Sequence, residues 1–222
     1  MRGLFRARGT IRLSVCARIA YHCVMTGPAE QRLLRRAQVH AATRTGILDA
    51  ARRVAARASA RELSLRGVAA EAGYAPAALY GYFASKDELL LALAADDLAH
   101  LSRAMRDAAA HPEGRGKLGA AAAAAVLLLR ETESLAAASG ALSSSVGSSD
   151  AERLFNGRLI AALKVLSDAA GNPADSREGQ CDVVLVAAAV AGLAMLARSG
   201  RLEALGFSAD EILARLDQRF TN

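Results

Sequence analysis

The stretch EAGYAPAALYGYF, Glu71–Phe83, decides how the rest of the chain is interpreted. It has the pattern of a helix end, a turn at Gly73 and a second helix that starts with Pro76. Glycine takes a positive φ without strain, and proline is tolerated at the first helical position. Residues 65–72, with Ser64 as N-cap, complete the first helix. The order of these elements predicts a helix-turn-helix.

The spacing of small and apolar residues supports this interpretation. Ala69 lies where the two helices are expected to cross, and Gly73 follows four residues later. Helices that cross at about 90–120° need a small residue at the contact and a glycine in the turn. Apolar side chains occupy the positions expected to face inward, Val68, Ala72, Tyr74 and Leu79. Any compact helical hairpin shares this spacing, so by itself it leaves DNA binding and a plain hairpin both open.

Composition predicts an all-α fold around the motif. Apolar residues make up 53% of the 222 residues, aromatics 4%, and there is no Trp. Alanine and leucine dominate, both are strong helix formers, and no sustained two-residue alternation is present. We expect helices at about residues 44–57, 65–72, 76–82, 86–110, 117–138, 150–170, 180–198, 201–205 and 208–220, with a short basic helix at 31–40.

Charge is unevenly distributed along the chain. The net charge is +6, but residues 1–39 hold eight arginines and one acid, Glu30. Such a basic arm predicts an anionic partner, either nucleic acid or a membrane surface. Three interpretations of residues 1–39 stay open: a transit peptide, a disordered leader, or a start assigned upstream of a true start at Met25.

Cysteine and histidine usage argues against disulfides, metal sites and catalysis. The three cysteines lack a framework spacing, which is typical of a reducing cytoplasm. Cys16, His22 and Cys23 lack the ligand spacing of a closed zinc site. No nucleophile–base pair or phosphate-binding loop is present, so we expect no cofactor and no enzyme activity. The most apolar segment, residues 183–197, is about as long as a buried core helix and shorter than a membrane span.

Residues 44–93 resemble the DNA-binding domain of the tetracycline-repressor (TetR) family. The similarity includes residues 47–51, the run Val68-Ala69-x-x-Ala72-Gly73, and the family's complete Leu-Tyr-x-x-Phe-x-x-Lys-x-x-Leu run at residues 79–89. The resemblance implies an all-α homodimer on a pseudo-palindromic operator in double-stranded DNA. It divides the chain into a basic extension (1–39), a three-helix DNA-binding domain (40–93) and a helical regulatory and dimerisation domain (94–222).

The resemblance also assigns roles to single residues. It implies phosphate contacts by Tyr80 and Lys86, and it places the remaining DNA contacts at Ser64, Arg66, Ala75, Pro76, Ala77, Ala78 and Tyr82. Positions 76–78 enter the major groove in the family, yet here they carry no polar group. We therefore expect methyl contacts, Arg66 and DNA shape to supply specificity. A core role for Tyr80 and a solvated role for Lys86 stay open.

By the same resemblance, we expect a cytoplasmic repressor that a small hydrophobic ligand releases from DNA. The ligand would lie among Leu128, Thr132, Phe155, Leu159 and Met195, for which plain core is the alternative. The helices that start near Gln180 and Ser208 are the expected dimer surface. Arg52, Arg53 and Arg57 are more typical of a solvated helix face than of a phosphate clamp. The alternative for the whole chain is a helical ligand-binding or scaffolding protein with a degenerate reading helix.

Overall fold

A computed structural model describes residues 27–58, 62–132, 134–135, 137–138, 149–171 and 176–221. Every regular element in these ranges is a helix, so the all-α prediction is confirmed. The chain divides into two units, residues 1–45 and 46–222.

Helix α2, Pro28–Ala58, contributes residues to both units. We expected a short helix at 31–40 and a separate helix from 44, but the two are one element. The segment is rich in alanine, arginine and leucine, which favour helix, and Gly46 alone weakens it, by about 1 kcal/mol. In the first unit, most side chains of residues 29–45 are exposed, among them Leu33 and Val39, each 65% exposed.

The second unit begins with the rest of α2 and continues through α3 (Leu65–Ala72) and α4 (Pro76–Leu79). Apolar residues of these helices and of the start of the next helix form one core cluster. Its buried members are Ile47, Leu48, Ala50, Ala51, Leu63, Val68, Ala69, Leu79, Phe83, Leu89, Ala92 and Leu93. These residues hold α3 and α4 in a fixed geometry against the second half of α2.

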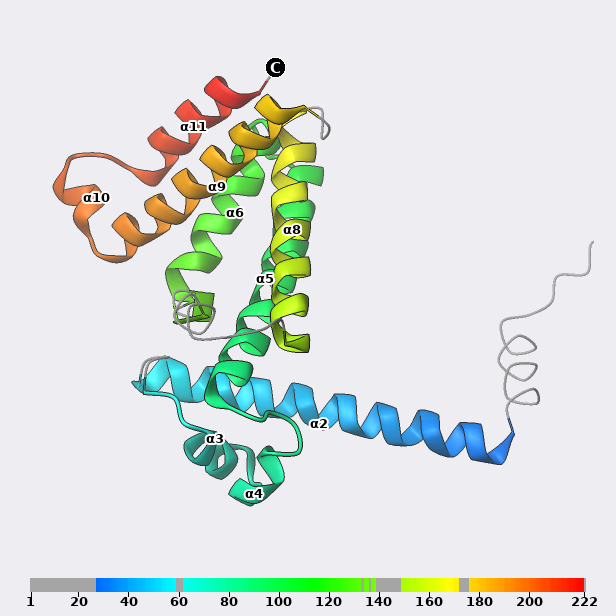
Figure 1. The fold of residues 1–222 in the computed structure, drawn as a ribbon. Coiled ribbons are helices and arrows are strands. Elements are labelled where there is room, and N and C mark those ends of the chain that lie inside the picture. Colours follow the sequence, from blue (N-terminus) through cyan, green and yellow to red (C-terminus); the bar gives the residue numbers. More distant parts are fainter. Residues whose placement is uncertain are drawn as a thin grey trace, which may run out of the picture. The chain divides into compact units, whose positions relative to one another are not determined.

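The longer of the remaining helices pack around an alanine-rich core, and the short α10 lies in the connection between α9 and α11 (Figure 1). Helix α5 packs against α6 and α8, and α9 packs against α6, α8 and α10. Four of the helices begin at a serine whose hydroxyl accepts a backbone N–H three residues on, which satisfies an otherwise unpaired donor. The helices are α5 (Lys86–Ala110), α6 (Lys117–Glu131), α8 (Asp150–Ala170), α9 (Arg177–Arg198), α10 (Arg201–Ala204) and α11 (Ala209–Phe220).

Helix α5 belongs to both clusters of the second unit. Its first turns place Leu89 and Leu93 in the helix-turn-helix core. Leu91, Ala94 and the residues that follow lie in the larger helical core. Because one rigid helix carries both sets of residues, a displacement of α5 in one cluster also displaces its residues in the other.

Helix α11 caps the N-terminus of α6. The backbone N–H groups of Gly116 and Gly119 donate to the carboxylate of Asp217 at 3.0 and 2.8 Å. A side chain on Gly116 would overlap that carboxylate. The end of the chain is therefore fixed to α6 by a charge-assisted contact.

Three helix ends differ from the sequence-based expectation. Helix α4 ends at Leu79 rather than Tyr82, because hydrogen bonds over the next residues have turn spacing. Helix α6 ends at Glu131 rather than at residue 138, because the backbone of the next residue, Thr132, is extended. Helix α9 starts three residues early because the Ser176 hydroxyl accepts the Gly179 N–H at 2.9 Å.

By length and composition, α9 (Arg177–Arg198) is long and apolar enough to cross a membrane, which the estimate of 15 apolar residues did not anticipate. This is weak support for a membrane span, because core helices meet the same criterion. Val183, Val186 and Val190 are buried against neighbouring helices of the second unit. The other side of the helix is exposed.

Candidate DNA-binding surface

The turn between α3 and α4 is formed by backbone hydrogen bonds around Gly73. Gly73 has φ 75° and ψ 25°, the left-handed conformation that favours glycine. The Tyr74 N–H donates to the Ala69 carbonyl at 2.9 Å, and the Gly73 N–H donates to the Ala70 carbonyl at 3.3 Å. These bonds satisfy carbonyls at the end of α3 and fix the direction in which the chain enters α4.

Helix α4 presents a small apolar face to solvent. Ala75 makes no side-chain capping bond, and Pro76 occupies the first turn. Ala75, Pro76, Ala77 and Ala78 are all exposed, whereas Leu79 is completely buried. Leu79 thus anchors the helix, and the residues predicted to enter the major groove are accessible.

The two tyrosines that follow have different surroundings. Tyr80 is 61% exposed, and its hydroxyl makes no hydrogen bond to the residues the structure describes. Tyr82 is half-buried and packs against the helix-turn-helix core. The core role left open for Tyr80 therefore fits Tyr82 better, and the Tyr80 hydroxyl is available to an external acceptor.

Lys86 is the first residue of α5 and is half-buried. The Ser85 hydroxyl accepts the Glu88 N–H at 3.1 Å, while the Glu88 carboxylate accepts the Ala84 N–H at 2.7 Å. Ser85 and Glu88 together fix the entry to α5, and the Glu88 carboxylate binds the N–H of Ala84, the residue before the N-cap. The positive end of a helix dipole adds to the lysine charge and favours a phosphate here.

Ser64 and Arg66 lie at the start of α3 and are both exposed. The Ser64 hydroxyl oxygen accepts the Gly67 N–H at 3.1 Å, so its own proton is still available to donate. Arg66 forms no ion pair or hydrogen bond within the part of the chain that the structure describes. Its guanidinium can therefore reach a base edge without breaking an internal contact.

Two arginines of α2 bind α3 rather than standing free in solvent. Arg53 donates to the Glu71 carboxylate at 2.7 Å, and Arg57 donates to its other oxygen. These two bonds, that of Arg53 first, lower the pKa of the Glu71 carboxyl below its ordinary value. The expectation of a solvated face is corrected, because both arginines hold α3 against α2.

Arg52 forms a second ion-pair network within this unit. It donates to Asp97 at 2.9 Å and to Asp49 at 2.8 Å, and it also pairs with Asp96. Burial lowers the pKa of the guanidinium, but hydrogen bonds to Asp96 and Asp97 outweigh this and raise it. Asp97 also accepts the hydroxyl of buried Ser134 at 2.5 Å. Sequence reasoning missed this network, for which the adjacent carboxylates at 96 and 97 were the one available signal.

The charge of the helix-turn-helix region is nearly balanced. Residues 46–93 contain six basic and five acidic residues. Three of the six, Arg52, Arg53 and Arg57, already pair with carboxylates. Few cations of this region therefore remain to neutralise DNA phosphates, which limits the electrostatic part of its affinity for DNA.

Residues 47–93 match the family model described as bacterial regulatory proteins, tetR family. The chain thus carries a TetR-family DNA-binding domain. It is a DNA-binding transcriptional regulator, as the resemblance of residues 44–93 implied. TetR-family regulators are generally not enzymes.

Solved structures share the fold over most of their length. A protein of unknown function from Rhodococcus sp. RHA1 is 25% identical, with a TM-score of 0.62 over 80% of this chain and 93% of that one. A TetR transcriptional regulator from Rhodococcus sp. RHA1 is 21% identical, with a TM-score of 0.57 over 81% and 95%. The regulator FadR from Bacillus subtilis, in complex with stearoyl-CoA, is 15% identical, with a TM-score of 0.56 over 80% and 97%. A comparison with curated proteins finds no match.

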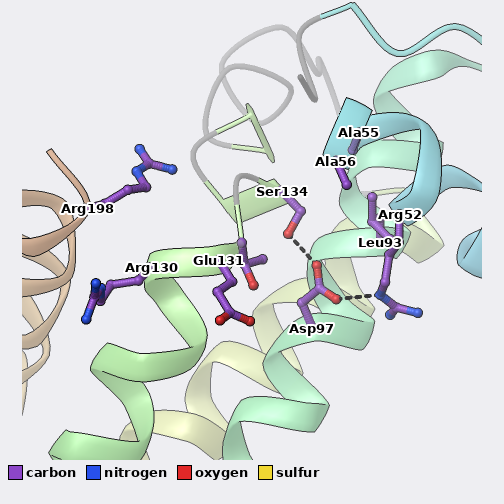
Figure 2. Close-up of a pocket in the computed structure, with 10 residues that line it drawn as sticks. Arg52, Ala55, Ala56, Leu93, Asp97, Arg130, Glu131, Ser134 and Arg198 are labelled. Atoms are coloured by element: carbon purple, nitrogen blue, oxygen red, sulfur yellow. Dashed lines mark hydrogen bonds and ion pairs between the residues drawn. The ribbon is translucent and has the colours of Figure 1, made fainter. Parts of the chain in front are cut away.

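A cavity of about 400 Å³ lies in the second unit beside the Arg52 network (Figure 2). Of the five predicted ligand residues, Thr132 lines it. Phe155 is buried in the helical core and Leu128 packs against that core, while Leu159 and Met195 are exposed. The structure does not gather the five residues in this cavity. Cys16, His22 and Cys23 lie outside the described residues, which contain no metal-binding cluster.

Proposed function

We propose that this TetR-family protein is a cytoplasmic homodimeric repressor that a ligand with a hydrophobic part releases from a pseudo-palindromic operator. In this proposal residues 40–93 contact DNA, and residues 94–222 dimerise and bind the ligand. The main support is the exposed surface around α4. Arg66 and the Tyr80 hydroxyl face solvent without internal hydrogen-bond partners among the described residues, on either side of Ala75–Ala78.

The exposed side of α9 supports dimerisation. No charged side chain lies on it over the 15 residues from Cys181 to Met195, a length of about 21 Å. Val184 and Met195 are 59% and 60% exposed there, which is unusual for large apolar groups on a monomer. This face consists of Cys181, Val184, Leu185, Ala188, Ala189, Ala191, Gly192 and Met195.

Helix α8 extends the apolar face of α9. Ile160 is exposed beside a groove of about 290 Å³, which Leu163, Val183 and Val184 also line. Helix α11, by contrast, buries Leu213 and Leu216 and exposes mostly charged positions. We therefore place the dimer contact on α8 and α9 rather than on α9 and α11.

The dimer proposal is tested with a charge placed in the centre of the face. Val184→Glu should convert the protein to a monomer in light scattering coupled to size exclusion, because a buried like-charge pair is costly across a twofold axis. Arg215→Glu on the exposed side of α11 is the control and should leave the mass unchanged. A dimer that persists in Val184→Glu contradicts this placement.

The cavity beside Arg52 suggests what kind of ligand fits. Ala55, Ala56 and Leu93 give it an apolar side, while Arg130 and Arg198 lie at its other side (Figure 2). An amphipathic ligand with an acyl chain and an anionic group matches both sides. The Bacillus subtilis FadR structure contains such a molecule, stearoyl-CoA. We therefore propose a long-chain acyl thioester as the effector class.

The effector proposal is tested by adding stearoyl-CoA, stearate or free coenzyme A to the protein–operator complex. Fluorescence anisotropy of a labelled operator should fall with stearoyl-CoA and not with coenzyme A alone. Arg130→Gln should raise the concentration that is needed, because it removes a cation from the cavity wall. If none of the three ligands changes the anisotropy, the effector class is wrong while the DNA-binding proposal stands.

The apolar face of α4 favours one second candidate. Because positions 75–78 carry no hydrogen-bonding side chain, the chain is alternatively a helical ligand-binding or scaffolding protein that has lost base readout. Affinity for DNA that is equal for all sequences would support this candidate.

A further inference from the structure

Residues 31–45 of α2, here called the basic helix, carry positive charges that lie outside the helix-turn-helix. Arg32, Arg35, Arg36 and Arg44 are its charged residues, and no acid occurs between Glu30 and Asp49. The described part of the first unit thus has a strong positive charge, in contrast to the nearly balanced residues 46–93.

Three of the four arginines lie on one side of the helix, and Arg44 does not share this face. Arg32, Arg35 and Arg36 are at i, i+3 and i+4, so they share one face, and all three side chains are exposed. The neighbouring Gln31 is half-buried. Leu33, Leu34, Ala37 and Ala41 lie on the opposite face at helical spacing. From Arg32 to Arg36 the arginine face extends about 6 Å along the helix, the axial length of about two base pairs.

The helix-turn-helix region needs an additional source of phosphate affinity. Its arginines on α2 are occupied by Glu71, Asp96 and Asp97, as described above. Protein affinity for DNA depends strongly on the number of phosphates that Lys and Arg neutralise. With Lys86 and Arg66 as the main cations near α4, that number is small.

We propose that the basic helix is a second DNA contact, which binds phosphates without sequence preference and increases the affinity of the whole protein. The inference rests on the proposed DNA-binding function. An exposed helix of this length is marginally stable by itself, so a bound phosphate backbone also stabilises it. Sequence preference would still come from residues 64–86.

Duplex DNA fits the basic helix better than an anionic membrane. Interfacial membrane helices insert large apolar or aromatic side chains into the lipid. The apolar face here has two leucines and otherwise alanines, and residues 27–58 contain no aromatic residue. The same chain also carries a DNA-binding domain, so duplex DNA is already the partner in the proposed function.

The test neutralises the arginine face in the full chain. The variant Arg32→Gln/Arg35→Gln/Arg36→Gln keeps helix propensity and removes three charges. The control Arg103→Gln/Arg106→Gln/Arg219→Gln removes the same charge from exposed positions on α5 and α11. Affinity for a random-sequence duplex is measured from 50 to 200 mM salt for wild type and both variants, with circular dichroism as the check of folding.

The wild-type affinity should fall more steeply with salt than that of the triple variant, by up to about 2.7 in the log–log slope. Over a fourfold rise in salt this difference amounts to about 40-fold in affinity. The control should keep the wild-type slope. Equal slopes for wild type and the triple variant overturn the proposal, as does an equal loss of slope in the control.

Two further outcomes separate the inference from its alternatives. Vesicles of phosphatidylcholine with phosphatidylserine serve as the membrane probe. Loss of vesicle binding in the triple variant, with an unchanged DNA slope, overturns the DNA contact in favour of a membrane surface. A wild-type protein that binds neither random nor selected DNA contradicts the proposed function itself. If the wild type prefers an operator but the triple variant keeps the wild-type salt slope, only this inference is contradicted.

Discussion

Arg52 on α2 donates to Asp97 on α5 at 2.9 Å, and Asp97 accepts Ser134 through its other oxygen at 2.5 Å. One carboxylate thus joins the helix-turn-helix core to the segment that follows α6. Each of its two oxygens accepts one hydrogen bond, and the one from Arg52 is also an ion pair.

Asp97→Asn should lower the free energy of unfolding by about 1–2 kcal/mol, because the neutral amide loses the charge that pairs with the partly buried Arg52 guanidinium. Urea unfolding followed by circular dichroism measures this, since the chain has no Trp. Asp49→Asn is the control, because it removes the exposed partner of the same arginine and should cost less than about 0.5 kcal/mol. Equal losses in the two variants would show that the link through Asp97 has no special role.

The Glu71 contact predicts a pH dependence of stability. Arg53 and Arg57 lower the pKa of this carboxyl from 4.5, so its stabilising effect is complete above that value. It is lost as pH falls through the lowered pKa. Glu71→Gln should therefore melt below the wild type at about pH 7, and the difference should shrink as the pH falls below 4.5 through the lowered pKa. Glu62→Gln, an exposed control, should show no such convergence; a pH-independent gap for Glu71→Gln would contradict the assignment.

Gly73 predicts a backbone effect without a steric clash. Its φ of 75° is costly for a residue with a Cβ, although nothing lies within 4 Å of where that atom would stand. Gly73→Ala should therefore destabilise the fold by about 1–2 kcal/mol. Gly46→Ala, in the interior of α2, should instead stabilise it by about 0.5–1 kcal/mol. A neutral Gly73→Ala in thermal unfolding would mean that the turn relaxes to a negative φ.

Arg66 and Lys86 should affect DNA binding in different ways. Arg66→Ala should cost about 1–3 kcal/mol on the preferred site and little on other sequences, since it removes a possible guanine contact. Lys86→Ala should weaken all sequences alike and reduce the salt slope by about 1. Competition binding with preferred and scrambled duplexes measures both, with Arg103→Ala as an exposed control on α5. If both variants change specificity equally, these roles are wrong.

The sequence predicted the helices with clear start and stop residues. Ser64 and Gly73 bound α3, and Ser85 starts α5, because the capping pattern is local and was visible in the sequence. The length of α2 was not predicted, since the break expected before Arg44 had no proline to cause it. The local sequence pattern predicts that a helix exists more reliably than it predicts the residues at which the helix begins and ends.

The candidate site was predictable only where the motif is continuous in sequence. Tyr80 and Arg66 are exposed as the DNA-contact roles require. The pairs Arg52–Asp97 and Arg53–Glu71 were not predicted, because they join residues 45 and 18 positions apart. Tertiary packing of α5 and α3 against α2 creates both pairs, and no local spacing indicates them.

Selection of bound sites from random duplex DNA by the full chain tests the central claim most directly. The account predicts an enriched inverted repeat, with half-sites separated by about one helical turn or a multiple of it. The selected duplex should bind at least about 10³-fold more tightly than a scrambled one at physiological salt. Selection that enriches no motif, together with equal affinity for all duplexes, would contradict sequence-specific DNA binding by residues 64–86.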